Sequence, residues 1–170
     1  MPARERTSKQ MDRSRLTQFL SQPLAELPLS EAPVIAPSAT VRAAVALMRE
    51  GSRSCVLAIQ DSGQPALAGI FTERDVLTKC MAEGFDWDQP LSKSVLTREP
   101  QTIPVTSTVA EAIATMQRHR YRTLPVTDGE KVVGLIRLGD LLTHLAEAYP
   151  EDILNLPPRP HQVMEKQEGG

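Results

Sequence analysis

The chain repeats itself after about 67 of its 170 residues. Three sequence features recur in the same order: Gln22-Pro23-Leu24 with Gln89-Pro90-Leu91, Thr40-Val41 with Thr108-Val109, and Gly69–Asp75 with Gly134–Asp140. The offset is 67, then 68, then 65 residues, so two small indels align the halves. A repeat constrains the architecture before any single motif does, because each copy is one structural unit. We therefore expect two similar units that face each other as a pseudo-symmetric pair, with equivalent clefts between them.

Composition restricts the class of protein. Hydrophobic residues make up 41% and charged residues 24%, which is ordinary for a globular domain. The formal net charge of −2 gives no electrostatic case for bulk binding to nucleic acid or membranes. Cys55 and Cys80 both lie in the first half, which argues against a disulfide framework and for a reducing compartment. The N-terminus lacks a signal-peptide core, and no window approaches the roughly 18 apolar residues of a membrane span. We expect a cytoplasmic protein without membrane insertion.

Apolar residues at positions i, i+3, i+4 and i+7 predict one amphipathic helix in each half. The two apolar stripes are Val41, Ala44, Val45 and Met48, and Val109, Ala112, Ile113 and Met116. Thr40 is a candidate N-cap and Gly51 a candidate C-cap of the first helix. Thr108 and Glu111 have the spacing of a full capping box at the start of the second.

Each of these helices is followed by the pattern of a β-hairpin and a closing helix. The predicted hairpin strands are Cys55–Ile59 with Ala66–Phe71, and Thr123–Thr127 with Val132–Ile136. The predicted closing helices are Glu73–Glu83 and Leu138–Tyr149, and a short helix, Ser14–Ser21, precedes the first repeat. The expected organisation is a disordered leader (1–13), a first domain with its N-terminal helix (14–86), a second domain (87–150) and a Pro-containing tail (151–170).

This order of elements, with Gly-apolar-apolar-Thr-x-x-Asp after the hairpin, resembles the cystathionine β-synthase (CBS) domain over roughly residues 22–150. Two such domains in tandem resemble a Bateman module. The resemblance implies an α+β fold of two α/β-type repeats, each strand-helix-hairpin-helix, packed through their sheets with pseudo-two-fold symmetry. It also implies a homodimer that regulates an unidentified target enzyme or transporter. With no catalytic domain beside the pair, the chain is similar to the stand-alone regulatory members, which are not enzymes and require no cofactor.

The resemblance also implies a ligand. In the family, adenine-containing ligands bind in two clefts between the domains, where the Asp of the motif holds the ribose hydroxyls and the Thr or Ser contacts phosphate. Carried onto this sequence, the implied ligand-binding residues are Ile35, Cys55, Val56, Thr72, Arg74, Asp75, Thr102, Tyr121, Arg122, Pro125, Arg137 and Asp140. A carboxylate can accept hydrogen bonds from two hydroxyls, which suits a ribose diol. The expected regulatory ligand is AMP, ADP or ATP.

Two interpretations of the motif stay open. Thr72 and Asp75 also have the spacing of a capping box, which would be a purely structural role. Arg137 replaces this Thr in the second copy and is a poor N-cap. It is either a solvent-facing residue or a guanidinium fork for phosphate oxygens, whereas Asp140 keeps the ribose role available. The two clefts should therefore not be equivalent.

Basic residues cluster before the second hairpin, namely Arg118, His119, Arg120 and Arg122, with Lys131 nearby. They form either a solvated face or a positive potential for a di- or triphosphate. Tyr121 either flanks the adenine or covers the core. His119, His144 and His161 lack the spacing of metal ligands, so we expect no metal site.

The sequence thus predicts a regulatory module that senses adenine nucleotides and signals to a partner protein by a change of shape or of self-association. The alternative is a protein-interaction scaffold of the same fold without nucleotide affinity, which the unequal halves favour. No nucleophile–base pair or phosphate-cradling Gly-rich loop points to catalysis. Nucleic acid is not an expected partner.

Overall fold

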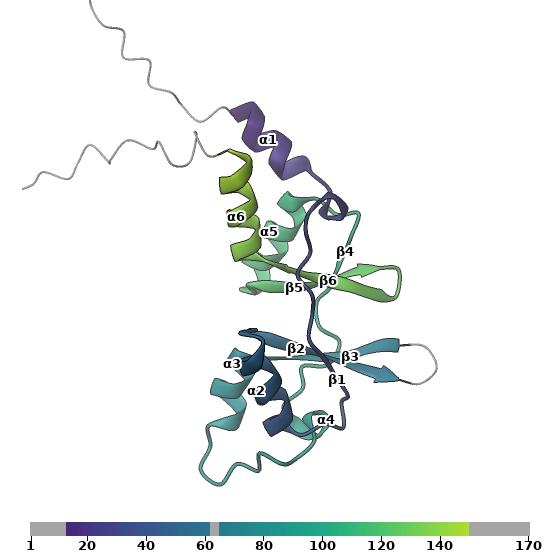
Figure 1. The fold of residues 1–170 in the computed structure, drawn as a ribbon, viewed down its shortest axis with the longest axis vertical. Helices are drawn as coiled ribbons and strands as arrows, with labels where there is room; N and C mark the ends of the chain where they lie inside the picture. The colour runs from purple at the N-terminus through teal and green to yellow at the C-terminus, as the bar shows by residue number, and fades with distance from the viewer. Residues whose placement is uncertain (1–12, 62–64, 150–170) are drawn as a thin grey trace, which may run out of the picture.

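Two halves of similar architecture stack along the long axis of the molecule (Figure 1). The computed structural model describes residues 13–61 and 65–149. Apart from Arg13, the predicted leader and the predicted tail lie outside the described residues. The first half forms the lower part of Figure 1, and the second half forms the upper part together with helix α1 (Arg13–Ser21). This helix confirms the one predicted before the first repeat.

The described residues form two three-stranded sheets, in the orders β1-β2-β3 and β4-β5-β6. The first half comprises β1 (Val34–Ile35), α2 (Val41–Glu50), β2 (Cys55–Asp61), β3 (Pro65–Thr72), α3 (Glu73–Asp75) and the π-helical turn η2 (Val76–Cys80). The second half comprises β4 (Ile103–Pro104), α5 (Val109–His119), β5 (Thr123–Asp128), β6 (Lys131–Arg137) and α6 (Leu138–Ala148). In each sheet the first strand runs parallel to the second, and the last two form an antiparallel hairpin. The predicted α+β repeat of strand, helix, hairpin and helix is confirmed.

The predicted helix caps are present. The Thr40 hydroxyl accepts a hydrogen bond from the Ala43 N–H at 3.1 Å, and Gly51 is the C-cap that follows Glu50, the last residue of α2. In the second half, Thr108 and Glu111 form both hydrogen bonds of a capping box. These local bonds explain why the two amphipathic helices begin at equivalent residues, because they satisfy N–H groups that have no partner within the helix.

The closing helix of the first half is shorter than predicted. The expected helix over Glu73–Glu83 ends instead at Cys80, and its last five residues are a π-helical turn. This turn buries Cys80, which is 1% exposed, whereas Met81 is 65% exposed. Because residues 81–84 are all exposed, tertiary packing does not extend the helix. The equivalent helix α6 is regular and confirms its prediction to within one residue.

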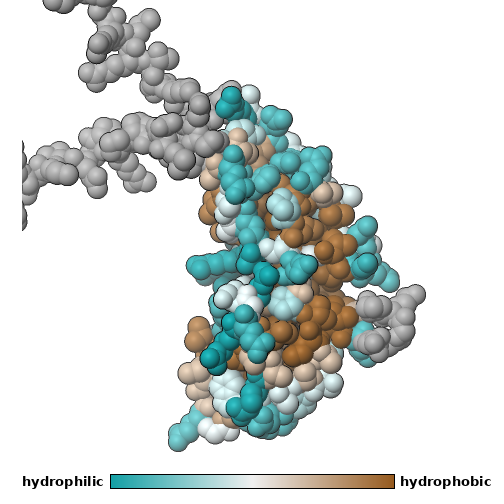
Figure 2. Space-filling model, viewed as in Figure 1, coloured by the Kyte–Doolittle hydropathy of each residue, from teal (hydrophilic) through white to brown (hydrophobic). Residues whose placement is uncertain are grey.

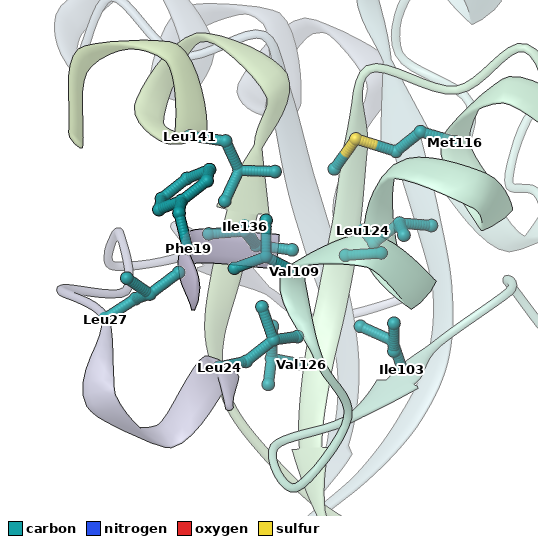
Figure 3. Close-up of a cluster of buried hydrophobic side chains, with 11 residues drawn as sticks. Phe19, Leu24, Leu27, Ile103, Val109, Met116, Leu124, Val126, Ile136 and Leu141 are labelled. Carbon is teal, nitrogen blue, oxygen red and sulfur yellow. The ribbon is translucent and has the colours of Figure 1, made fainter. Parts of the chain in front are cut away.

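The Gln-Pro-Leu sequence of each repeat packs on the opposite half. Leu24 lies in a short 3-10 helix, η1 (Leu24–Glu26), and belongs to the core of the second half with Phe19 and Leu27 (Figure 3). Leu91, in α4 (Leu91–Ser94), belongs to the core of the first half. Residues 28–33 and 96–102 then return to their own halves; we call them the crossing segments (Figure 1). The spacing of apolar residues within each repeat does not predict that these segments pack on the opposite half.

The two sheets face each other. Cys55, Leu57 and Ile70 of the first half form one buried cluster with Leu135 of the second. Strands β3 and β6 contact each other across this boundary. Figure 2 shows hydrophobic residues gathered where the halves meet, on the side from which the hairpins project. The predicted packing through the sheets with pseudo-two-fold symmetry is therefore confirmed.

Candidate ligand site

Asp75 lies at the first turn after the hairpin of the first half and is 7% exposed. Its Oδ2 atom accepts hydrogen bonds from the backbone N–H of Thr72 at 2.8 Å and from the Thr72 hydroxyl at 2.6 Å. The Thr72 hydroxyl in turn accepts from the Asp75 N–H at 3.3 Å. The structural interpretation of the motif is thus confirmed, since these bonds form a capping box.

The other oxygen of Asp75 faces a lysine and the second crossing segment. Its Oδ1 atom lies 2.7 Å from the ammonium of Lys79 and 3.3 Å from the hydroxyl of Thr97. Lys79 also donates to the Val95 carbonyl at 2.9 Å and to the Thr97 hydroxyl at 3.2 Å. The capping carboxylate therefore also holds the segment that leads into the second half.

Asp140 occupies the equivalent place in the second half, where Arg137 replaces Thr72. The guanidinium of Arg137 donates to both carboxylate oxygens of Asp140, each at 2.9 Å. Ser30, on the first crossing segment, donates to Asp140 at 2.9 Å and accepts from Arg137 at 3.0 Å. The sequence allows two predictions for Arg137, a solvent-facing side chain or one directed at a phosphate; the guanidinium is instead paired with the carboxylate of its own motif.

The two charges of this pair stabilise each other. Partial burial raises the pKa of the Asp140 carboxyl, but hydrogen bonds from Arg137 and Ser30 and the Arg137 charge lower it more, so the pKa lies below its ordinary value. The hydrogen bond to Asp140 raises the pKa of the Arg137 guanidinium. A bidentate arginine–carboxylate pair of this kind combines charge with fixed geometry.

The glycine that opens each motif allows the crossing segment to approach the strand. A Cβ atom on Gly69 would lie 2.6 Å from the Thr97 carbonyl oxygen, and one on Gly134 would lie 2.8 Å from the Leu29 side chain. The residue after each glycine exchanges two backbone hydrogen bonds with the crossing segment: Ile70 with Thr97, and Leu135 with Ser30. The whole motif, from Gly to Asp, thus anchors the chain where it passes between the halves.

Sequence reasoning missed three residues that contact the motif carboxylates, namely Ser30, Lys79 and Thr97. A signal for two of them was present. Ser30 and Thr97 are hydroxyl residues 67 positions apart, the same offset as the Gln-Pro-Leu repeat. Lys79 carried no such signal, because its equivalent in the second half is His144.

Arg74 connects the two halves. Its guanidinium donates to the carbonyl of Arg120 at 3.0 Å, and Arg120 adopts a left-handed backbone conformation at the end of α5. The neighbouring Tyr121 stacks on His119, with ring centroids 5.4 Å apart. Arg118, Arg120 and Arg122 are exposed and form no ion pair with any other described residue. A positive surface therefore adjoins Arg74 at the boundary between the halves.

The remaining predicted residues lie on different faces of the sheets. Ile35 and Val56 pack into the core beneath the helices of the first half, away from the second sheet. Cys55 lies in the cluster between the sheets. Pro125 is buried on β5 between two residues of the helix-side core, which places it on the opposite face. Thr102, just before β4, is half-buried.

Neither cysteine resembles a reactive site. Burial raises the pKa of the Cys55 thiol to about 11, although the charge of Arg137 lowers it. Burial also raises the pKa of the Cys80 thiol. Both are free thiols, and a neutral buried thiol is a poor nucleophile.

Other kinds of site receive little support in the described part of the chain. No group of His, Cys, Asp and Glu residues within residues 13–61 and 65–149 could hold a metal ion. None of the described helices is long and apolar enough to cross a membrane. A pocket of about 500 Å³ lies between α1, η1 and α6, lined by residues including Gln18, Glu26 and His144. It contains none of the predicted ligand residues.

Known proteins share both the sequence pattern and this fold. The CBS domain family matches residues 24–82 and 92–147. The CBS domain-containing protein YhcV of Bacillus subtilis is 30% identical over 107 residues, which cover 63% of this chain and 74% of YhcV. Arabinose 5-phosphate isomerase KpsF of Escherichia coli is also 30% identical, over 69% of this chain but only 35% of its own length.

Solved structures agree with this relationship. A crystal structure of a conserved protein from Pyrococcus horikoshii aligns with a TM-score of 0.67 and 26% identity, over 74% of this chain and 93% of that one. The CBS domain protein PAE2072 from Pyrobaculum aerophilum, solved in complex with AMP, aligns with a TM-score of 0.64 and 22% identity, over 74% of this chain and 99% of that one. The repeated motif, the paired sheets and the family match agree, and the chain belongs to the CBS domain family as a tandem pair.

Proposed function

We propose that this CBS pair is a regulatory module that binds an adenine nucleotide between its halves and signals to a partner protein. The observation that carries the proposal is the position of Asp75. Its carboxylate lies in the motif at the boundary, beside Arg74, whose guanidinium reaches the second half at Arg120. The AMP complex of PAE2072, which has the same fold, supports a nucleotide as the ligand.

The proposed contacts follow from the chemistry of these side chains. Asp75 would accept hydrogen bonds from the ribose hydroxyls. Thr72 and Arg74 would contact phosphate, because a guanidinium forms strong hydrogen bonds to phosphate oxygens. The exposed arginines 118, 120 and 122 would add positive potential for a longer phosphate chain. We assign no contact to Ile35 or Val56, since both pack beneath the helices.

Signalling would use the crossing segment. The Oδ1 atom of Asp75 now contacts Lys79 and Thr97. A ribose diol that takes over this oxygen would compete with Thr97 and so weaken the attachment of residues 96–102 to the first half. A ligand shifts a conformational equilibrium by its differential affinity for the two states. The ligand-bound state would therefore be one in which this segment is held less tightly.

The partner surface would include a second copy of the chain. Leu77 and Leu142 occupy equivalent positions and are 69% and 59% exposed. Leu77 follows α3, and α3 and α6 lie on the same side of the molecule (Figure 1). Exposed leucines at two symmetry-related positions favour self-association through this side. The regulated protein would be an enzyme or transporter, and the two free thiols fit a location in the cytoplasm.

One observation favours a scaffold without nucleotide affinity. The four hydrogen-bond or ion-pair contacts of Asp75, two on each oxygen, already use the capacity of a carboxylate. A diol must therefore displace an existing partner. In a scaffold, the motif would serve only to anchor the crossing segments.

Thermal unfolding distinguishes the two functions, because a bound ligand raises the melting temperature by mass action. The protein is heated with AMP, ADP, ATP or adenosine, with GMP as the control for the base. A sensor shows a shift that grows with adenine nucleotide concentration and is smaller with GMP. The same melting temperature with every compound at millimolar concentration supports the scaffold.

A further inference from the structure

We propose that Arg137 excludes a nucleotide from the second half, so that each chain binds one nucleotide, at the Asp75 half. This inference rests on the proposed function and adds a stoichiometry to it. The starting point is the equivalence of Thr72 and Arg137, which hold the same position before the motif carboxylate of their half.

Arg137 occupies the atoms that a ribose would need. Its Nε and Nη2 atoms donate to Oδ2 and Oδ1 of Asp140, so both carboxylate oxygens bind the same guanidinium. The side chains of Arg137 and Asp140 are 33% and 25% exposed. A diol that approaches from solvent therefore meets a closed ion pair, in which one guanidinium occupies both carboxylate oxygens.

A ribose diol displaces an existing partner more easily at Asp75 than at Asp140. If a diol takes the Oδ1 atom of Asp75, Lys79 loses its 2.7 Å ion pair with that atom but keeps two hydrogen bonds, to the Val95 carbonyl and the Thr97 hydroxyl. Thr72 keeps both of its bonds to Oδ2. Release of Arg137 from Asp140 would instead break two of its three side-chain hydrogen bonds and leave only the one to Ser30. A partly buried guanidinium without its carboxylate is costly.

The second half also lacks the cation that would contact phosphate. The residue equivalent to Arg74 is Gly139, which has no side chain. Because Arg137 is paired with Asp140, the motif of the second half offers neither a free cation for phosphate nor an available carboxylate for ribose. These two differences act in the same direction and come from separate positions.

Equilibrium dialysis with radiolabelled AMP tests the stoichiometry. The wild-type chain is expected to bind one AMP, and R137T, which restores the Thr-x-x-Asp sequence of the first half, two. D75A should bind none at the same concentration, and D75A/R137T should bind one. R42T is the matched control with one AMP, because Arg42 forms a similar two-point pair with Asp88 outside the motifs. Circular dichroism checks folding, and R137S replaces R137T if that variant is unfolded.

Each outcome decides between the claims. Two AMP bound to the wild type, or one AMP bound to each of the wild type and R137T, would overturn exclusion by Arg137 and leave the sensor function standing. One AMP bound to R137T and none to the wild type would support exclusion and overturn the sensor function of the natural chain. If neither binds AMP, both claims are wrong. The comparison of the wild type with R137T is sufficient even if the D75A variants do not fold.

Discussion

The α-carbon of Gly69 lies so close to Thr97 that a Cβ atom on it would be 2.6 Å from the Thr97 carbonyl oxygen. The same Cβ would be 2.6 Å from the Leu96 side chain. Because the Thr97 carbonyl accepts a hydrogen bond from the Ile70 N–H, it cannot move away without breaking that bond, so G69A must displace the crossing segment. We expect G69A to lower the free energy of unfolding by about 1–3 kcal/mol, as overpacking does.

Gly139 provides the control for this prediction. A Cβ on it would meet nothing within 4 Å, and the residue is the second of α6, in its first turn. G139A should therefore not lower the stability and should raise it by up to about 0.5–1 kcal/mol, the helix-propensity gain of a helix interior. Urea unfolding of G69A, G139A and the wild type gives the change in the free energy of unfolding for each variant. Equal stability of G69A and the wild type would show that the segment does not need this close approach.

The Arg137–Asp140 pair should make stability depend on pH. The folded-state pKa of Asp140 is lowered, so its stabilisation is present above the ordinary carboxyl value, near 4, and is lost as pH falls through the folded value. At pH 7 we expect D140N to be less stable than the wild type by about 1–3 kcal/mol. The difference should shrink as pH falls below about 4 and through the lower folded-state value, since the carboxyl becomes neutral first in the unfolded and then in the folded protein. Urea unfolding across this range checks it, and a difference independent of pH would refute the pair's contribution.

Both thiols should be unreactive while the protein is folded. Cys55 and Cys80 are 2% and 1% exposed, and burial raises the pKa of both thiols. A disulfide reagent at pH 8 is expected to modify neither residue within minutes in buffer and to modify both at once in urea. Rapid modification of the native protein at either cysteine would contradict this burial.

Self-association through the side that carries Leu77 and Leu142 can be tested by replacing these two leucines with charged residues. The double variant L77K/L142K should be monomeric at concentrations where the wild type is a dimer, because two lysines per chain would be buried without partners. Light scattering after size-exclusion chromatography gives the mass. V133K is the control, since Val133 is 41% exposed on β6, outside the two closing helices. A monomeric wild type, or a dimeric double variant, would exclude this surface.

The elements that sequence could predict are those that local chemistry determines. Thr108 and Glu111 satisfy each other's backbone groups within one turn, so their spacing alone predicts the start of α5. Local chemistry does not determine that Leu24 and Leu91 each pack in the core of the opposite half. Their positions depend on long-range packing, which the spacing of residues within a repeat does not contain. The early end of the first closing helix at Cys80 likewise follows from burial rather than propensity.

The sequence predicts the motif residues of the candidate site, because they recur in both repeats, but it does not predict their hydrogen-bond partners. Asp75 and Asp140 follow from the repeat, and both lie in equivalent anchors of the crossing segments. Arg137 is visible in the sequence as a departure from Thr72, but its partner is not. The position of the Arg137 guanidinium is determined by both carboxylate oxygens of Asp140 and by Ser30, which is 107 residues away in the sequence. Long-range hydrogen bonds of this kind leave no periodicity to detect.

Calorimetric titration of AMP into the wild type and D75A tests the central claim most directly. We predict saturable binding to the wild type and an affinity about 10- to 150-fold weaker in D75A, which is the loss expected for hydrogen bonds to a charged group. T97A serves as the control, because it frees an acceptor on Asp75 and should bind AMP at least as tightly as the wild type. No heat of binding to the wild type at millimolar AMP, or equal affinity in the wild type and D75A, would contradict the account.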